Sequence, residues 1–224
     1  ALLAGEAAAQ GTGLIGKGFK AGLGMYKFTG DDVEMDLSAM LPDASTASPD
    51  NKVGFAAGGY LTIGLGPHAA LQPELLYVQK GAKNSLNYYE DDIGERVDAD
   101  INFKLDYVEV PVLFKYLFAT EGSTRPSLFL GPVMAIKASS NLAVEVSVPG
   151  YGSDEVEVEL EDVQSLDFGA VVGAGLDFAA GEGSIVFDVR YTLGLSEWPD
   201  AGEVDVTSTS IKNSGFMVTV GYGF

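Results

Sequence analysis

The stretch Phe216-Met-Val-Thr-Val-Gly-Tyr-Gly-Phe224 alternates large apolar residues with small or polar ones. Successive side chains of a β-strand point to opposite faces, so this pattern predicts a strand. One face is apolar, and the other holds small or polar residues such as Thr219 and Gly221. Strands with two such faces are typical of a closed barrel whose outer surface contacts lipid.

Seven further segments show the same alternation, and together with the first stretch they predict eight strands. No apolar run approaches the roughly 18 residues of a membrane-spanning helix, so strands must make any membrane span. We therefore expect an all-β fold, an eight-stranded antiparallel up-and-down transmembrane β-barrel, in which 216–224 closes the sheet against the segment around Phe19. The seven segments are 15–28, 52–65, 69–80, 103–118, 127–138, 166–178 and 184–195.

The predicted connections alternate between short and long. The short ones are Gly66 to His68, Ala119 to Pro126 and Ala179 to Gly183. The long ones span 30–51, 81–102, 139–166 and 196–210. Consecutive connections of an up-and-down barrel lie at opposite ends. One end therefore carries the short connections and the other end carries the long ones. Outer-membrane barrels have periplasmic turns and extracellular loops of this kind.

Negative charge is concentrated in the four long connections. They hold 23 of the 32 acidic residues but only Lys83 and Arg96 of the 13 basic ones, a formal charge of −21 against −19 for the whole chain. This excludes nucleic acid as a partner, because phosphate binding requires Lys and Arg. Three interpretations remain: a solvated surface that also suits a high-salt habitat, a protein-binding surface, or divalent cation sites at carboxylates such as Asp91, Asp92, Asp98 and Asp100.

The polar faces of the strands favour a membrane barrel over a soluble barrel of the lipocalin kind. A soluble exterior is dense in charged and hydroxyl side chains, whereas these faces are mostly glycine and alanine with single charges. Small residues suit the narrow interior of an eight-stranded barrel. We expect the interior charges to pair with one another as a structural network, because buried charges require partners. They are Lys20, Glu74, Lys80, Glu109, Lys115, Asp167, Asp177, Asp188 and Arg190.

Aromatic residues near the strand ends predict where the barrel meets the membrane interfaces. Trp198 follows the segment 184–195 on the side of the long connections, where we expect an interfacial anchor. At the opposite interface we expect a belt that includes Phe118, Phe178, Tyr222 and Phe224.

Residues 1–10 differ from the rest of the chain. Ala7-Ala-Ala9 fits the small-x-small pattern of a signal-peptide cleavage site before Gln10. We expect residues 1–10 to be a signal-peptide remnant or a short N-terminal arm, and residues 11–224 to form a single outer-membrane barrel domain. The chain has no cysteine, so it holds no disulfide.

The residues give little support for catalysis, and we predict that the protein is not an enzyme. A hydrolase normally needs a histidine as general base, and the single histidine, His68, lies in a short turn opposite the elaborated end. We expect it to be a solvated turn residue. No residue points to a cofactor, and the identity of any metal stays open.

Three segments resemble the porin-like outer-membrane β-barrel domain of PorT type: Leu71–Gly81, Leu105–Tyr116 and Asp188–Leu195. Gly18–Gly22 and Gly221–Phe224 fit the same pattern. The resemblance implies a small barrel of the OmpA or OmpX kind in the outer membrane of a Gram-negative bacterium. It also implies insertion by the barrel-assembly machinery, which recognises a terminal aromatic strand.

From these features we predict a non-enzymatic integral outer-membrane protein with a structural or surface-interaction role. We expect a monomer that contacts outer-membrane lipid and whose acidic extracellular loops bind cations or a surface partner. The alternative is a narrow cation-preferring porin or small-solute channel. Side chains alone fill the interior of an eight-stranded barrel, which favours the first interpretation.

Overall fold

The computed structural model describes residues 12–29, 50–90, 95–118, 122–148, 152–159, 166–196 and 212–224. No helix among them is long and apolar enough to cross a membrane. The described residues form nine strands, which are β1 (Gly13–Thr29), β2 (Asp50–Gly66), β3 (Ala69–Glu90), β4 (Glu95–Leu117), β5 (Thr124–Val148), β6 (Gly152–Glu159), β7 (Leu166–Ala180), β8 (Gly183–Gly194) and β9 (Lys212–Gly223).

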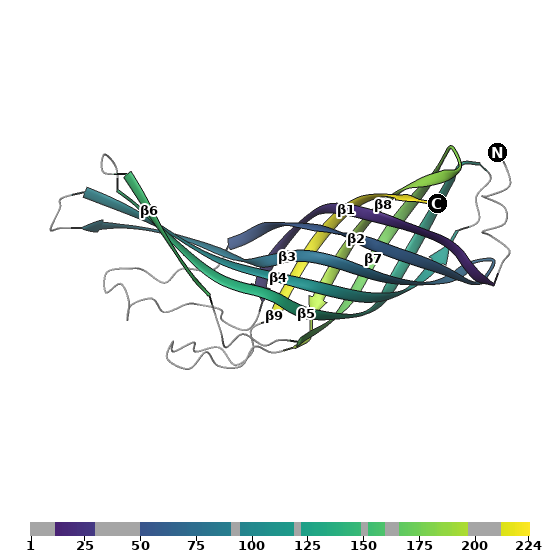
Figure 1. The fold of residues 1–224 in the computed structure, drawn as a ribbon, viewed down its shortest axis with the longest axis horizontal. Coiled ribbons are helices and arrows are strands. Elements are labelled where there is room, and N and C mark those ends of the chain that lie inside the picture. Colours follow the sequence, from purple (N-terminus) through teal and green to yellow (C-terminus); the bar gives the residue numbers. More distant parts are fainter. Residues whose placement is uncertain are drawn as a thin grey trace.

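Eight of the strands close into an antiparallel barrel (Figure 1). The strand order is β4-β3-β2-β1-β9-β8-β7-β5, and an additional pairing of β4 with β5 joins the two ends. The ninth strand, β6, pairs only with β5 and stays outside this ring. The predicted eight-stranded antiparallel barrel is therefore confirmed.

The predicted closing strand pairs as expected. In β9, Tyr222 lies opposite Phe19 of β1, and the pairing continues to Lys212 opposite Thr29. Two backbone hydrogen bonds between Lys17 and Phe224 extend it by one step, with N–O distances of 2.8 and 3.2 Å. This pairing, with that of β4 and β5, leaves no free edge in the eight-stranded barrel.

The barrel is apolar outside and polar inside. Alternate residues of every barrel strand expose large apolar side chains, for example Phe19 at 60% and Phe216 at 62%. The opposite face buries charged side chains, for example Lys20 at 2% and Glu74 at 3%. A soluble barrel would have the reverse distribution, because its outside meets water and its inside excludes it. The outer face is thus built to contact lipid.

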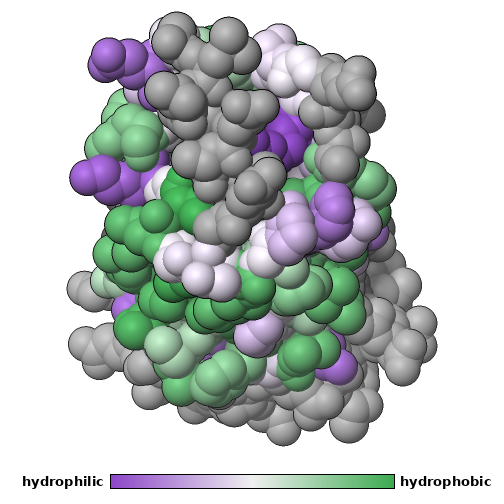
Figure 2. Space-filling view, turned by 90° about the vertical axis from the view of Figure 1, so that its right-hand side faces the viewer, coloured by the Kyte–Doolittle hydropathy of each residue, from purple (hydrophilic) through white to green (hydrophobic). Residues whose placement is uncertain are grey.

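The short connections gather at one end of the barrel (Figure 1). Pro67 and His68 join β2 to β3, and Gly181 and Glu182 join β7 to β8. Gly181 has a φ of 65°, a left-handed conformation that favours glycine in a tight turn. Figure 2 faces this end and shows hydrophobic residues (green) across its described surface, with hydrophilic residues (purple) scattered among them.

Two segments predicted as loops contain strands instead. β3 and β4 continue as far as Glu90 and Glu95, and β5 continues to Val148 before turning into β6. Valine, isoleucine and tyrosine alternate with acidic residues in these segments, and such residues favour extended backbone even where neither face meets lipid. The prediction was wrong here because it required one apolar face.

These continuations form a sheet that extends beyond the barrel (Figure 1, left). It consists of residues 84–90, 95–102, 141–148 and 152–159, and we call it the projecting sheet. Its order is β3-β4-β5-β6, so β6 is an edge strand that pairs on one side only within the described chain.

Candidate functional site

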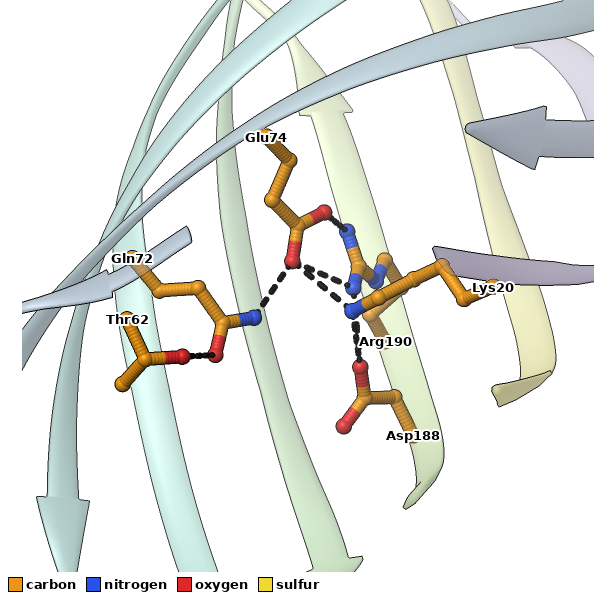
Figure 3. A network of polar contacts seen from close by, with 6 residues as sticks. All are labelled: Lys20, Thr62, Gln72, Glu74, Asp188 and Arg190. Atoms are coloured by element: carbon orange, nitrogen blue, oxygen red, sulfur yellow. Dashed lines mark hydrogen bonds and ion pairs between the residues drawn. The ribbon is translucent and has the colours of Figure 1, made fainter. Parts of the chain in front are cut away.

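Four charged side chains from three strands meet inside the barrel (Figure 3). Lys20 comes from β1, Glu74 from β3, and Asp188 and Arg190 from β8. Each occupies the inward face of its strand because its neighbours in sequence, such as Phe19 and Leu75, are exposed to the outside. We call these four residues the ion-pair cluster.

The ion-pair cluster is tightly connected and formally neutral. Arg190 holds Glu74 with two guanidinium nitrogens, at Nη1–Oε2 2.7 Å and Nη2–Oε1 3.2 Å. Lys20 donates to Glu74 at 2.8 Å and also contacts Asp188. Arg190 Nη2 lies 3.1 Å from the same Asp188 carboxylate. Two cations and two anions thus compensate one another, as buried charges require.

Two uncharged side chains extend the cluster toward β2. Gln72 Nε2 donates to Glu74 Oε1 at 2.7 Å, and Thr62 Oγ1 donates to Gln72 Oε1 at 3.1 Å. Both residues lie on the polar faces that the alternation predicts, but they were not among the predicted site residues. The signal for Gln72 is its position two residues before Glu74 on one face of β3, since such residues are neighbours. Thr62 follows only from the pairing of β2 with β3, in which Tyr60 lies opposite Glu74.

A second ion pair lies elsewhere along the lumen. Lys80 contacts Glu109 at 2.6 Å, and its ammonium lies 5.8 Å from the ring of Tyr26 and 5.2 Å from that of Tyr107. Such cation–π contacts stabilise a buried ammonium. Asp167 lines the same small space as Lys80.

Lys115 and Asp177 are two further predicted interior charges. They do not form an ion pair with each other in the described structure. Lys115 is buried beneath the ring of Phe129, at 5.9 Å from its centroid, and no described carboxylate lies within ion-pair distance of it. Asp177 and Ser127 each present a buried oxygen that has no hydrogen-bond partner among the residues that the structure describes.

Glycines on the inward faces leave space for tyrosine rings. A Cβ on Gly18 would approach Tyr60 Oη to 2.6 Å, and a Cβ on Gly24 would approach the Tyr26 ring to 2.4 Å. These distances are too short for van der Waals contact. The many glycines of the polar faces therefore let large rings fill a lumen that strands alone would leave open.

The space near these side chains differs from place to place, and an open pocket of about 450 Å³ adjoins Glu74. A pocket lined by Lys80, Asp167, Thr192 and Asn213 leaves no volume for a water molecule. Nor do three His, Asp or Glu side chains gather into a metal-binding group anywhere in the described ranges. The ion-pair cluster can therefore brace the barrel and fill it, and its chemistry offers neither a nucleophile with a base nor a metal site.

The predicted loop carboxylates are only partly described. Asp91 and Asp92 lie outside the described residues. Asp98 and Asp100 lie on β4, opposite Asn87 and Ser85 of β3, in the projecting sheet. They are therefore strand residues rather than loop residues, and cation binding by them stays a prediction.

Four of the five predicted interface aromatics lie near the end with the short connections. Tyr116 and Phe118 meet edge to face with ring centroids 5.0 Å apart, and Phe178 meets Phe187 in the same way at 5.8 Å. Phe224 lies 6.4 Å from Phe19. Tyr222 is partly buried, with its hydroxyl 3.4 Å from the Ala180 carbonyl. Trp198 lies outside the described residues.

Comparison with solved structures finds bacterial proteins that are similar over most of the chain at low sequence identity. OprG from Pseudomonas aeruginosa is 13% identical, with 97% of this chain and 98% of that one covered and a TM-score of 0.45. Neisserial surface protein A is 14% identical, with coverage of 92% and 95% and a TM-score of 0.42. Ail of Yersinia pestis is 15% identical, with coverage of 96% and 100% and a TM-score of 0.39.

Sequence comparison gives the family. No curated protein matches the chain significantly. A family model described as "Outer membrane protein beta-barrel domain" matches residues 8–198, which is most of the chain. The resemblance seen in the strand motifs is thus confirmed at the level of the family. With its closed barrel and its lipid-facing exterior, the chain belongs to the outer membrane protein β-barrel domain family.

Proposed function

We propose that the protein is a non-enzymatic barrel whose lumen is sealed and whose function lies in the surface that it presents outside the cell. The observation that carries this proposal is the ion-pair cluster, in which Lys20, Glu74, Asp188 and Arg190 meet across the lumen. An open pore would leave such charges hydrated, whereas these side chains are at most 2% exposed.

The surroundings of the histidine support a non-enzymatic role. His68 stacks on Tyr116 with ring centroids 5.9 Å apart, and its Nδ1 lies 3.0 Å from the Leu117 carbonyl. It lies in the turn between β2 and β3, at the opposite end from the projecting sheet. A general base must reach its nucleophile within hydrogen-bond distance, and no serine or threonine hydroxyl is a hydrogen-bond partner of this ring in the described structure.

The projecting sheet supplies the proposed interaction surface. Its sequence places Asp154, Glu155, Glu157 and Glu159 on β6, the edge strand. An exposed strand edge can bind another extended chain through its backbone, and dense carboxylates favour a basic partner or hard cations. We infer that the sheet faces the outside of the cell and binds a basic protein segment or divalent cations.

Planar-bilayer recording of the purified, refolded protein tests the sealed lumen. We expect no stable unitary conductance from the wild-type barrel. The alternative, a narrow cation-preferring channel, requires stable cation-selective steps that change when Glu74 or Glu109 is neutralised. Observing such steps would overturn the sealed-barrel proposal.

Calcium titration followed by the fluorescence of Trp198, the single tryptophan, tests cation binding separately. We expect a saturable change that magnesium reproduces only partly, because calcium accepts more oxygen ligands with looser geometry. No response at millimolar calcium would exclude the cation role and leave a basic partner as the proposed ligand.

A further inference from the structure

The open pocket of about 450 Å³ lies on the outer face of the barrel, toward the end with the short connections. Its walls come from the outward faces of β1, β2 and β3 and from the residue after β9, and we call it the lateral groove. The wall residues are Lys17, Gly59, Leu61, Pro73, Leu75 and Phe224. All of them except Lys17 are apolar. The volume lies within the roughly 300–1,000 Å³ of pockets that bind small molecules.

The register of the strands explains why the surface is hollow here. Gly59 of β2 lies opposite Phe19 of β1 and opposite Leu75 of β3, and both of these side chains are exposed on the outer face. Glycine has no side chain, so the row of apolar side chains is interrupted between the two strands. Leu61, two residues further along β2, lies opposite Lys17 and borders the same gap.

The packing of the barrel does not require glycine at position 59. A Cβ on the preceding Gly58, which faces the lumen, would lie 2.0 Å from the Leu75 carbonyl oxygen, so a side chain cannot be accommodated there. A Cβ on Gly59 would meet only the Gly18 carbonyl oxygen, at 3.4 Å, and Gly59 is not among the glycines with a positive φ. The barrel could therefore carry a side chain at this position, and the glycine leaves the groove open.

Lys17 places a positive charge at the rim of the lateral groove. Its side chain is exposed, and its ammonium lies 5.1 Å from the centroid of the Phe224 ring. Two backbone hydrogen bonds between Lys17 and Phe224 fix the base of this contact. No described carboxylate side chain forms an ion pair with Lys17. The groove thus combines apolar walls with a cation at its edge.

We propose that the lateral groove binds an acyl chain of a phospholipid from the adjoining leaflet, and that Lys17 binds the phosphate of the same lipid. The groove opens onto the lipid-facing surface, so an acyl chain enters it without leaving the membrane. Apolar walls favour the chain, and a lysine side chain extends toward the headgroups, where it attracts anionic groups. The short turns of outer-membrane barrels lie in the periplasm, so the ligand comes from the periplasmic leaflet.

Native mass spectrometry of the refolded barrel, released from micelles that contain phosphatidylglycerol, tests the groove. We expect a retained lipid adduct on the wild type and about ten-fold lower occupancy in Gly59→Leu, whose side chain fills the groove. The matched control is Ala57→Leu, which adds the same side chain two residues away on the outward face of β2, outside the groove, and should leave occupancy unchanged. Equal occupancy of wild type and Gly59→Leu, an equal loss in Ala57→Leu, or no retained adduct on the wild type would each overturn the proposal.

The same measurement tests the phosphate contact. Lys17→Gln should lower phosphatidylglycerol occupancy about five-fold, whereas Lys17→Arg should retain it. Lys27→Gln is the control, because Lys27 is exposed on the same face of β1 near its other end. Diacylglycerol, which has no phosphate, should bind the wild type about five-fold more weakly than phosphatidylglycerol and should not respond to Lys17→Gln. Equal binding of the two lipids would overturn the role of Lys17.

Heat-modifiable migration shows whether each variant folds. If Gly59→Leu does not fold, Gly59→Val takes its place with the same expected direction, since valine favours strands and also fills part of the groove. Unchanged occupancy in folded Gly59→Val would then count against the groove in the same way.

Discussion

Glu74 faces both cations of the ion-pair cluster, with contacts of 2.7 and 2.8 Å to Arg190 and Lys20. Replacing it by glutamine leaves two buried cations against Asp188 alone. We expect Glu74→Gln to lower the free energy of unfolding by about 3–5 kcal/mol, because the removal of one partner leaves an uncompensated buried charge. Urea titration in lipid vesicles, followed by heat-modifiable migration, measures this change.

A double substitution distinguishes the effect of an uncompensated charge on stability from the effect of lost contacts. Lys20→Met/Glu74→Gln retains Arg190 and Asp188 as a neutral pair, so we expect it to be more stable than Glu74→Gln alone. The exposed Glu182 provides the control, since Glu182→Gln should change the free energy of unfolding by no more than about 0.5 kcal/mol. Additive losses from the two single substitutions would contradict the role of charge balance.

Two glycines of β1 differ in the space around them. A Cβ on Gly18 would lie 2.3 Å from the Tyr222 carbonyl oxygen, whereas a Cβ on Gly16 would lie 3.8 Å from its nearest neighbour, Thr62. We expect Gly18→Ala to lower the free energy of unfolding by about 1–3 kcal/mol through overpacking, with Gly16→Ala close to neutral. The same urea titration compares them, and equal effects would show that the contact at Gly18 relaxes without cost.

At the scale of elements, the hairpin of β5 and β6 is separable from the barrel. Residues 141–148 pair with 152–159, while the barrel closure depends on the part of β5 that pairs with β4 and β7 between Thr124 and Lys137. Deleting residues 143–158 should therefore keep heat-modifiable migration and change the free energy of unfolding by about 1 kcal/mol or less. Failure to fold would show that the projecting sheet is required to close the barrel.

The strands of the barrel could be predicted because lipid on one side and a filled lumen on the other impose a period of two. In β9 the alternation identifies the strand and its two faces, and closure of the eight predicted strands gives its pairing with the segment around Phe19. The sequence predicts a connection at β6, because the segment Gly-Ser-Asp-Glu-Val-Glu-Val-Glu is rich in acidic residues. It forms a strand because β5 supplies hydrogen-bond partners, which the local sequence does not reveal.

The sequence predicts which charged residues face the lumen, but it does not predict which of them form ion pairs with one another. The inward face of each strand follows from its alternation, which assigns Lys20, Glu74 and Arg190 to the lumen. Which charges meet depends on strand stagger and tilt around the barrel, and these are properties of closure rather than of any single strand. For this reason Lys80 meets Glu109, while Lys115 lies against the ring of Phe129.

At the scale of the whole molecule, charge is distributed unevenly along the chain. The ion-pair cluster in the lumen is formally neutral, whereas the long connections carry the negative excess. The short turns and the projecting sheet lie at opposite ends (Figure 1). The molecule therefore has two chemically different ends, and its orientation in the membrane decides which one meets a partner.

Single cysteines test that orientation, because the chain has none of its own. Glu157 lies on β6 of the projecting sheet, and Glu182 lies in the turn between β7 and β8. Outer-membrane barrels keep their short turns in the periplasm, so we expect a membrane-impermeant maleimide to label Glu157→Cys in intact cells. Glu182→Cys, the matched control, should react only after the outer membrane is permeabilised. Labelling of Glu182→Cys in intact cells, with Glu157→Cys protected, would reverse the orientation and place the acidic sheet in the periplasm.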